Sequence, residues 1–305
     1  MTLTRLGTRG SPLALAQARE TAALIAAAHG VPLEKIEIVV IKTTGDMIQD
    51  RALSEAGGKG LFTKELDEAL LRGDIDAGVH SAKDLPTVLP DGIFVGGYLP
   101  REDVRDVLIS LHAKSVAELR RGGTVGTASL RRAAQIKRLR PDLKIALLRG
   151  NVGTRLRKVE AGEFDATLLA LAGMRRLGLA GHASAILDTA DFLPACGQGA
   201  VAVTVRTGDA KTAAALAPVY HAATGFALAA ERAFLAVLDG SCRTPIAGLA
   251  ALAEGRLRFR GEVLAPDGSA TIDVAMSGAP EAAVKLGRAA GEDILRRMPP
   301  GFMKA

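Results

Sequence analysis

Aromatic side chains are scarce in this chain. Of its 305 residues none is Trp, and Phe, Tyr and Trp together make up 3%, whereas 48% of the residues are hydrophobic. The hydrophobic cores must therefore be aliphatic, built from Ala, Leu, Val and Ile. A chain of this length and composition is expected to form two or three domains of ordinary size.

Cysteine and long apolar runs are scarce as well. The only cysteines are Cys196 and Cys242, and apolar runs such as residues 21–28 are far shorter than the ~20 residues of a membrane-spanning helix. The first twenty residues lack the basic start and long apolar stretch of a secretory signal. We therefore expect a cytoplasmic protein without a membrane partner, in which both cysteines are thiols.

Patterns typical of metal and nucleotide sites are missing. The five histidines are isolated, and none has a Cys, Asp or second His at metal-ligand spacing: His29, His80, His112, His182 and His221. This spacing predicts that no metal is bound. The glycine-rich segment 57–60 contains Lys59, but no Ser or Thr follows that lysine as in a phosphate-binding P-loop.

Basic residues are concentrated in one segment. The net charge is only +6, from 39 basic and 33 acidic residues, but residues 129–158 contain ten basic residues and a single acid, Asp142. A solvated helix face usually mixes both signs of charge. The segment therefore predicts a surface or cleft for anions.

Short apolar runs alternate with amphipathic segments through most of the chain. Strands are expected at residues 3–8, 36–42, 77–80, 124–126, 144–148, 166–170 and 200–206, and helices at 12–28, 62–71, 130–139 and 152–161. This alternation predicts βαβ units around a sheet with parallel strands, and the β-branched run at 36–42 predicts a buried strand. Residues 46–60 are polar and glycine-rich, which indicates a loop.

The last third has a different pattern. A long apolar helix is expected at residues 224–238, two strands at 257–264 and 270–277, and a closing helix at 282–297. The two strands are joined by Pro266-Asp267-Gly268, a turn signal. This order predicts a smaller α+β domain.

Arginines occur where predicted strands pass into helices. Arg9 precedes Ser11 in the first such turn, and residues 127–132 and 149–155 form two more. Each turn combines small polar residues, free helix N-terminal amides and guanidinium groups, which together bind carboxylates and phosphates.

Asp84 and the cysteines are less informative by themselves. Asp84 follows a predicted strand, where aspartate frequently caps a helix, and this role is favoured from the residues alone. Cys242 lies in the loop segment 240–245, but free cysteines are usually buried and inert. Cys196, within residues 194–199, is equally ambiguous: it is either a functional thiol or a buried, inert one.

The segments that carry these residues resemble one family in order along nearly the whole chain. The resembling segments are residues 9–14 (RGSPLA), 57–66 (GGKGLFTKEL), 80–84 (HSAKD), 126–132 (GTASLRR), 148–155 (LRGNVGTR), 194–199 (PACGQG) and 231–245. Together they resemble the porphobilinogen deaminases.

The resemblance implies an α/β fold with three domains. Two domains with mixed sheets, similar to the lobes of periplasmic solute-binding proteins, would surround a cleft. Domain 1 would comprise residues 1–99 and 200–217, and domain 2 the arginine-rich residues 100–199. Residues 218–305 would form a smaller α+β domain with a cysteine loop.

The resemblance also implies an activity. The family is expected to deaminate four porphobilinogen molecules and condense them stepwise onto a covalent dipyrromethane cofactor. Hydroxymethylbilane and ammonia are released in tetrapyrrole biosynthesis. A monomer is expected, with hand-over of the product to uroporphyrinogen-III synthase.

Residue roles follow from the same resemblance. Cys242 would hold the cofactor through a thioether, Asp84 would be the catalytic carboxylate, and Lys59 would lie on a mobile lid. The residues expected to bind cofactor and substrate are polar or basic, with one glycine: Arg9, Ser11, Gln17, Lys59, Ser81, Lys83, Thr127, Ser129, Arg131, Arg132, Arg149, Asn151, Arg155, Arg176, Gln198 and Gly199.

Four positions depart from the family pattern. Ala82 replaces a larger apolar residue, Val104 a common proline, and Ala223 an acid. Cys196 replaces a small or branched apolar residue and adds a thiol that is expected to be open to oxidation.

Two other classes of protein share some of these features. A solute-binding protein for a small polycarboxylate, without catalysis, would account for the arginine-rich turns but not for a third domain with a cysteine loop. A nucleic-acid-binding protein would account for the basic segment, but stacking aromatics are few and the arginines lie at separate turns.

Overall fold

The computed structural model describes residues 4–44, 63–240 and 244–303. The chain divides into two compact units. Unit 1 comprises residues 1–102 and 200–225, and unit 2 comprises residues 103–199 and 226–305. The C-terminal part thus belongs to the same compact unit as residues 103–199, and the division into three domains stays a prediction.

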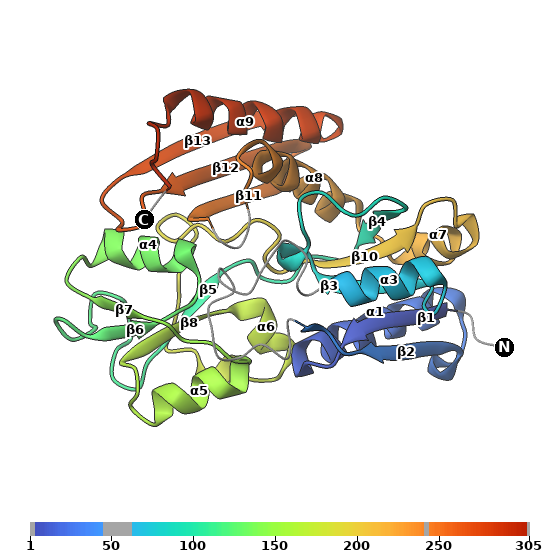
Figure 1. Cartoon of the computed structure of the whole chain (residues 1–305), viewed down its shortest axis with the longest axis horizontal. Coiled ribbons are helices and arrows are strands. Elements are labelled where there is room, and N and C mark those ends of the chain that lie inside the picture. The colour runs from blue at the N-terminus through green and yellow to red at the C-terminus, as the bar shows by residue number, and fades with distance from the viewer. Residues whose placement is uncertain (1–3, 45–62, 241–243, 304–305) are drawn as a thin grey trace. The chain divides into compact units, whose positions relative to one another are not determined.

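Unit 1 is a five-stranded mixed sheet with helices on it (Figure 1). Its elements are β1 (Thr4–Arg9), α1 (Pro12–His29), β2 (Ile36–Ile41), α3 (Lys64–Arg72), β3 (Ala77–Ser81), β4 (Ile93–Tyr98), β10 (Val201–Arg206) and α7 (Ala210–Leu216). The strand order is β2-β1-β3-β10-β4. Strands β1, β2 and β3 are parallel, whereas β10 is antiparallel to both β3 and β4.

Helix α1 has clear start and stop signals in the sequence. The Ser11 side chain caps its first turn, Pro12 occupies the first helical position, and Gly30 ends it in a left-handed conformation with φ 60°. Its inner face is made of small residues such as Ala18 and Ala22, which lets the helix lie close to the sheet. The helix predicted at residues 12–28 is confirmed and extends one residue further, to His29.

The first part of unit 2 repeats this design. Its elements are β5 (Asp106–Ile109), β6 (Thr124–Gly126), α4 (Leu130–Leu139), β7 (Lys144–Ala146), α5 (Val152–Glu160), β8 (Ala166–Ala170), α6 (Leu171–Arg176) and β9 (Ala185–Ile186). The strand order is β7-β6-β8-β5-β9. Because β6 is parallel to both β7 and β8, the carboxyl ends of these three strands meet at one edge, where α4, α5 and α6 begin.

The C-terminal part of unit 2 is a three-stranded antiparallel sheet with two helices. Its elements are α8 (Ala222–Val237, in unit 2 from Phe226 onward), β11 (Ile246–Ala253), β12 (Arg256–Leu264), β13 (Thr271–Gly278) and α9 (Ala283–Arg297). Short 3₁₀ turns occur at residues 33–35, 82–84, 180–182, 217–219 and 280–282. Phe234 of α8 packs on Phe259 of β12 with ring centroids 4.9 Å apart. The predicted class, α/β with mixed sheets and a smaller α+β part, is confirmed.

Two predictions about strands were wrong in part. The strand predicted to be buried at residues 36–42 lies at the edge of its sheet, and Val40 is 52% exposed. An apolar β-branched run does not distinguish a central strand from an edge strand, because that depends on which strands pair with it. Strands β4, β5, β9 and β11 were not predicted; β11 (IAGLAALA) lacks the β-branched content that marks a strand.

No single helix within the described ranges is long and apolar enough to cross a membrane. One helix pair, residues 210–219 with 222–237, satisfies the length and composition criteria when counted together, but it is bent by 110°.

The turn between β12 and β13 lies directly on helix α4 (Figure 1). Gly268 at its tip has φ 77°, and a Cβ there would lie 2.5 Å from the Arg138 backbone nitrogen and 2.7 Å from the Ala134 carbonyl oxygen. Only glycine fits this conformation and this space. The C-terminal sheet is thereby packed closely against α4.

We predict that Gly268→Ala lowers the free energy of unfolding by more than about 3 kcal/mol, since left-handed strain adds to a backbone clash. Gly255→Ala is the matched control, because Gly255 also has a positive φ, 72°, but faces open space. It should cost about 1 kcal/mol. Denaturant unfolding of both variants measures the difference, and equal losses would contradict the close packing on α4.

Candidate functional site

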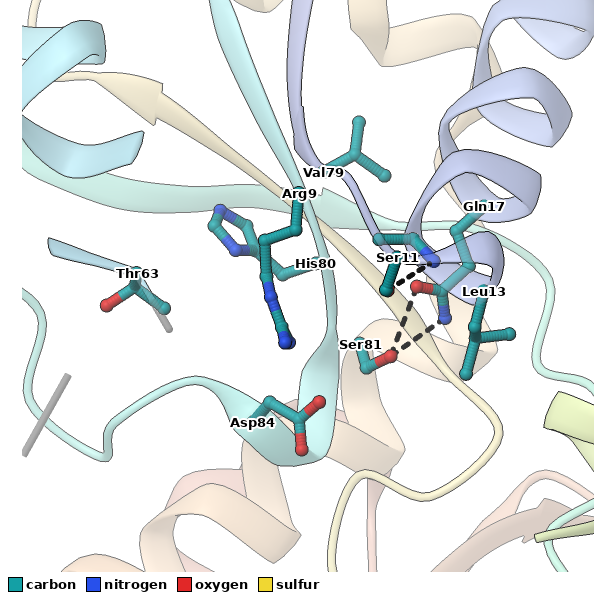
Figure 2. A pocket seen from close by; sticks show the side chains of 10 residues that line it. Arg9, Ser11, Leu13, Gln17, Thr63, Val79, His80, Ser81 and Asp84 are labelled. Carbon is teal, nitrogen blue, oxygen red and sulfur yellow. Dashed lines mark hydrogen bonds between the residues drawn. The ribbon is translucent and has the colours of Figure 1, made fainter. Parts of the chain in front are cut away.

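A pocket opens in unit 1 where β1 and β3 end and α1 begins (Figure 2). It is lined by Arg9, Ser11, Leu13, Ala14, Gln17, Thr63, Val79, His80, Ser81 and Asp84. Because β1 and β3 are parallel neighbours, their carboxyl ends deliver these residues to the same edge of the sheet. The pocket brings together Arg9, Ser11, Gln17, Ser81 and Asp84 of the residues predicted from the sequence.

Hydrogen bonds hold the side of the pocket formed by α1. The Ser11 hydroxyl accepts from the Ala14 backbone N–H at 3.3 Å, and so serves as the helix cap. The Gln17 amide, which is buried, donates to the Ser81 hydroxyl at 2.9 Å and accepts from it at 3.1 Å. This pair ties α1 to the end of β3.

Two side chains of opposite charge point into the pocket. Figure 2 shows the guanidinium of Arg9 and the carboxylate of Asp84 directed into it from different elements. The pocket also contains His80, which is buried with Nε2 3.1 Å from the Thr204 hydroxyl. Burial and the positive charge of Arg9 lower the pKa of His80 to about 4, so its imidazole is neutral at pH 7.

Asp84 is not a helix cap. It is the last residue of a single 3₁₀ turn, Ala82–Asp84, and Ser81 stands at the cap position. The role favoured from the residues alone was therefore wrong, because the turn starts immediately after β3 instead of after Asp84. Asp84 is exposed, and Lys83 precedes it on the same turn.

A buried acid behind the pocket was not identified from the sequence. Asp67 of α3 is 4% exposed, and Thr63, whose hydroxyl donates to its carboxylate, lines the pocket. Burial raises the pKa of Asp67 from 3.8 to about 6, despite the Thr63 hydrogen bond. One signal was available, since Asp67 lies beside Leu66 and near Leu70 on the buried face of an amphipathic helix.

In unit 2, two predicted turns lie on the adjacent parallel strands β6 and β7. After β6, the Ser129 hydroxyl caps α4, and Thr127 accepts from the Ser129 N–H at 3.1 Å. After β7, the Asn151 side chain caps α5 by accepting from the Thr154 N–H at 2.9 Å. Two helix N-termini with their positive dipole ends therefore lie at one edge of the sheet.

Arg131 and Arg132 are buried, and they share one carboxylate. Asp106, at the start of β5, lies with Oδ2 2.8 Å from Arg131 Nη1 and Oδ1 2.6 Å from Arg132 Nη2. Burial alone would raise the pKa of Asp106, but the two guanidinium charges outweigh it and hold that pKa well below its usual range. The sequence did not identify Asp106, and binding of a ligand by these two arginines stays a prediction.

Arg155 has an excess of positive charge around it. Its Nε donates to the Gly150 carbonyl at 2.9 Å, and the side chain is half-buried. Burial and the charges of Arg132 and Arg149 lower the pKa of Arg155 to about 10. An anion placed here would relieve this repulsion, so the residues fit a group that carries carboxylates.

The last predicted residues lie around the turn at 194–199. Arg176 Nη1 donates to the Gly199 carbonyl at 3.2 Å, and the buried Gln198 donates to the Val104 carbonyl at 2.7 Å. Cys196 is also buried, with Sγ 2.6 Å from where a Cβ on Gly248 would lie. The thiol occupies space that β11 leaves for it, and this burial disfavours the oxidation expected from the sequence, which stays a prediction.

Two predicted residues, Lys59 and Cys242, lie outside the described residues. Within residues 4–44, 63–240 and 244–303, no group of three or more His, Cys, Asp and Glu side chains is arranged to hold a metal ion. The prediction that no metal is bound stays a prediction.

Arginines beside capped helix N-termini are typical of sites in α/β proteins that hold carboxylates or phosphates. Family models match both parts of the chain. The model of the porphobilinogen deaminase, dipyromethane cofactor binding domain, matches residues 4–214, and that of the porphobilinogen deaminase C-terminal domain matches residues 226–296. The chain belongs to the porphobilinogen deaminase family.

Named relatives agree with this family. Porphobilinogen deaminases of Nitrobacter winogradskyi and Nitrobacter hamburgensis are 55% and 54% identical to the chain over 295 residues, which cover 97% of this chain and 93% of each relative. A solved nutrient-binding protein from Burkholderia cenocepacia bound to methionine matches with 15% identity and a TM-score of 0.42. That match covers 70% of this chain and 90% of the other.

We predict that the ionisation of Asp67 makes the stability of the protein depend on pH. Its carboxyl ionises near pH 4 in the unfolded chain but only near pH 6 in the folded protein. The wild type therefore loses about 3 kcal/mol of stability as the pH rises from about 4 to about 7.

Asp67→Asn removes this dependence and should be more stable than the wild type at pH 8 but not at pH 4. Denaturant unfolding at both pH values measures the difference in the free energy of unfolding between the variant and the wild type. The control is Glu68→Gln, an exposed acid on the same helix. An Asp67→Asn effect that is the same at both pH values would contradict the prediction.

Proposed function

We propose that this protein is a porphobilinogen deaminase. It deaminates four porphobilinogen molecules, joins them stepwise and releases hydroxymethylbilane and ammonia in tetrapyrrole biosynthesis. The proposal depends most on the crowding of Arg132, Arg149 and Arg155, which favours an anionic ligand such as a carboxylate. The full-length similarity to porphobilinogen deaminases supports the same substrate.

The arginines bind the acidic side chains of the substrate. Each porphobilinogen carries an acetate and a propionate, so every condensation adds two carboxylates. Guanidinium groups hold carboxylates through two parallel hydrogen bonds, which fixes orientation as well as charge. Arg149, Arg155 and Arg176 of unit 2 and Arg9 of unit 1 are assigned this role, together with the amides and hydroxyls at the caps of α4 and α5.

Asp84 stabilises positive charge on the substrate. Loss of ammonia from porphobilinogen leaves a cationic, electrophilic pyrrole, and the condensation places positive charge on a second ring until a proton leaves. An ionised carboxylate accepts hydrogen bonds from pyrrole N–H groups and opposes this charge. At about 4 Å and an effective dielectric constant of about 20, one such pair is worth about 4 kcal/mol before desolvation.

Cys242 is assigned to hold a dipyrromethane group through a thioether. This group supplies, when bound, the free pyrrole carbon to which the first porphobilinogen is joined. The described arginines fit its carboxylates for the same reason that they fit those of the substrate. The further candidates for contact with it are Lys83, Thr127, Ser129, Arg131, Arg132, Asn151, Gln198 and Gly199. Lys59 is assigned to a lid.

The remaining parts of the proposal concern cellular context. The protein is proposed to be a cytoplasmic monomer that passes its product to uroporphyrinogen-III synthase. A solute-binding protein is the second candidate, but the relatives of similar length are named as deaminases. A nucleic-acid-binding function is disfavoured because Arg131 and Arg132 are buried with Asp106 instead of forming an exposed basic stripe.

The intact mass of the purified chain tests the cofactor. We expect extra mass equal to two pyrrole units in the wild type and none in Cys242→Ser. Cys196→Ala is the matched control, since it removes the other thiol and should keep the added mass. A bare wild-type chain that also takes up no mass from porphobilinogen would favour the solute-binding alternative.

Substitution of Asp84 tests its catalytic role. Asp84→Ala and Asp84→Asn should lower kcat by about 10³-fold, because about 4 kcal/mol of charge stabilisation is lost. Far-UV circular dichroism and the melting temperature should stay at wild-type values, because Asp84 is exposed. Asp91→Asn, an exposed aspartate in the same unit, should keep full activity. Near-normal turnover in the Asp84 variants would rule out the assigned role.

A further inference from the structure

Gln135 of α4 connects Arg131 to the C-terminal sheet. The amide is completely buried, and its Oε1 accepts from Arg131 Nη1 at 2.8 Å. Its Nε2 donates to Glu262 Oε1 of β12 at 2.5 Å and to the Leu193 carbonyl at 2.9 Å. Glu262, also buried, accepts a second bond from Arg138 Nη1 at 2.9 Å.

These bonds allow only one orientation of the Gln135 amide. An ionised carboxylate and a carbonyl can only accept hydrogen bonds, and a guanidinium can only donate them. The amide NH₂ must therefore face Glu262 and Leu193, and the amide oxygen must face Arg131. A flipped amide would place its NH₂ against the guanidinium of Arg131 and its oxygen against the acceptors of Glu262 and Leu193. Both contacts are costly in a buried site.

The hydrogen bonds of Arg131 are concentrated at one end of its guanidinium. Nη1 lies within bonding distance of Gln135, the Leu193 carbonyl (3.0 Å) and Asp106. Nε is buried and donates to no atom of the described ranges. A buried N–H without an acceptor is unfavourable, and a carboxylate oxygen would satisfy it.

The buried charges also favour one more anion. Three guanidinium groups, those of Arg131, Arg132 and Arg138, are paired with two carboxylates, those of Asp106 and Glu262. The set therefore has one excess positive charge. Burial and Arg132 lower the pKa of Arg131, whereas Asp106 and Glu262 oppose this change. A bound carboxylate would neutralise the set.

We infer that Glu262 and Gln135 are positioning residues that hold Arg131 in the orientation in which it receives a carboxylate of the dipyrromethane group. This inference rests on the proposed function. Glu262 acts through Gln135 and touches neither cofactor nor substrate. The docking of Gly268 on α4 supports it, because β12 can orient an α4 side chain only if sheet and helix keep a fixed spacing. The C-terminal sheet thereby contributes to the arginine site through Glu262.

The inference is tested with Glu262→Gln and Glu262→Leu in the full-length chain. Glu262→Gln keeps the shape of the side chain and should keep the fold. Its own amide, however, can turn an NH₂ toward the NH₂ of Gln135, and an NH₂ cannot accept the hydrogen bond that orients Gln135. Glu254→Gln is the matched control, because Glu254 is an exposed acid that pairs with Arg258 in the same sheet but is not linked to Arg131.

The first measurement is the ¹⁵N–¹H NMR signal of Arg131 Nε, assigned by its loss in Arg131→Lys. We expect both Glu262 variants to shift or broaden this signal and the control to leave it unchanged. A purely structural role for Glu262 would change the melting temperature without changing the Arg131 signal. An unchanged signal in both Glu262 variants would overturn the inference.

The second measurement is the rate at which cofactor-free chain gains the mass of two pyrrole units from porphobilinogen. We expect about tenfold slower gain in the Glu262 variants, the effect of weakening one hydrogen bond to a charged group. An altered Arg131 signal with wild-type loading would also overturn the inference. If the wild type gains no mass, the proposed function fails, whereas the Arg131 signal still decides whether Glu262 orients this arginine.

Discussion

The ion pairs of Asp106 with Arg131 and Arg132 organise unit 2. Removing an ionised carboxylate from water costs several kcal/mol, and only well-placed opposite charges offset that cost. Asp106 meets this condition with two guanidinium groups from one turn of α4. Because Asp106 is the first residue of β5, the pairs fix this helix against the sheet. The cap at Ser129, the position of Arg132 beside Arg155 and the link to Glu262 all depend on α4 being held there.

Both units keep a charge in a place that is unfavourable for stability. In unit 2 the cations outnumber their buried partners, and the pKa of Arg155 falls to about 10. In unit 1 a carboxyl group is buried behind the pocket, and the pKa of Asp67 rises to about 6. Perturbed pKa values of this kind are concentrated at functional sites, where a ligand completes the electrostatics. In unit 2, where the excess charge is positive, the stability lost in the free protein is the counterpart of affinity for an anionic ligand.

Local signals in the sequence predicted many of the helices and strands. They could not predict which strands and side chains that are far apart in the sequence come into contact. Helix α4 and strands β6 and β8 were predicted residue for residue, because caps such as Ser129 and short apolar runs mark them locally. Asp106 could not be paired with Arg131, because β5 was not predicted and their contact depends on the order of strands in the sheet. The Gln135–Glu262 bond joins residues that are 127 positions apart, and neither residue has a pattern that indicates it.

The position of β10 has a consequence for how the chain folds during synthesis. This strand pairs with both β3 and β4, yet β4 ends at Tyr98 and β10 begins at Val201. During synthesis on the ribosome, β3 and β4 lack their shared partner strand until all of residues 103–199 have emerged. Until then, the edges that pair with β10 keep unpaired hydrogen-bonding groups. Open strand edges are prone to wrong pairing and aggregation. A nascent chain stalled before Val201 would therefore be a substrate for chaperones, whereas the first part of unit 2 can already form its own sheet.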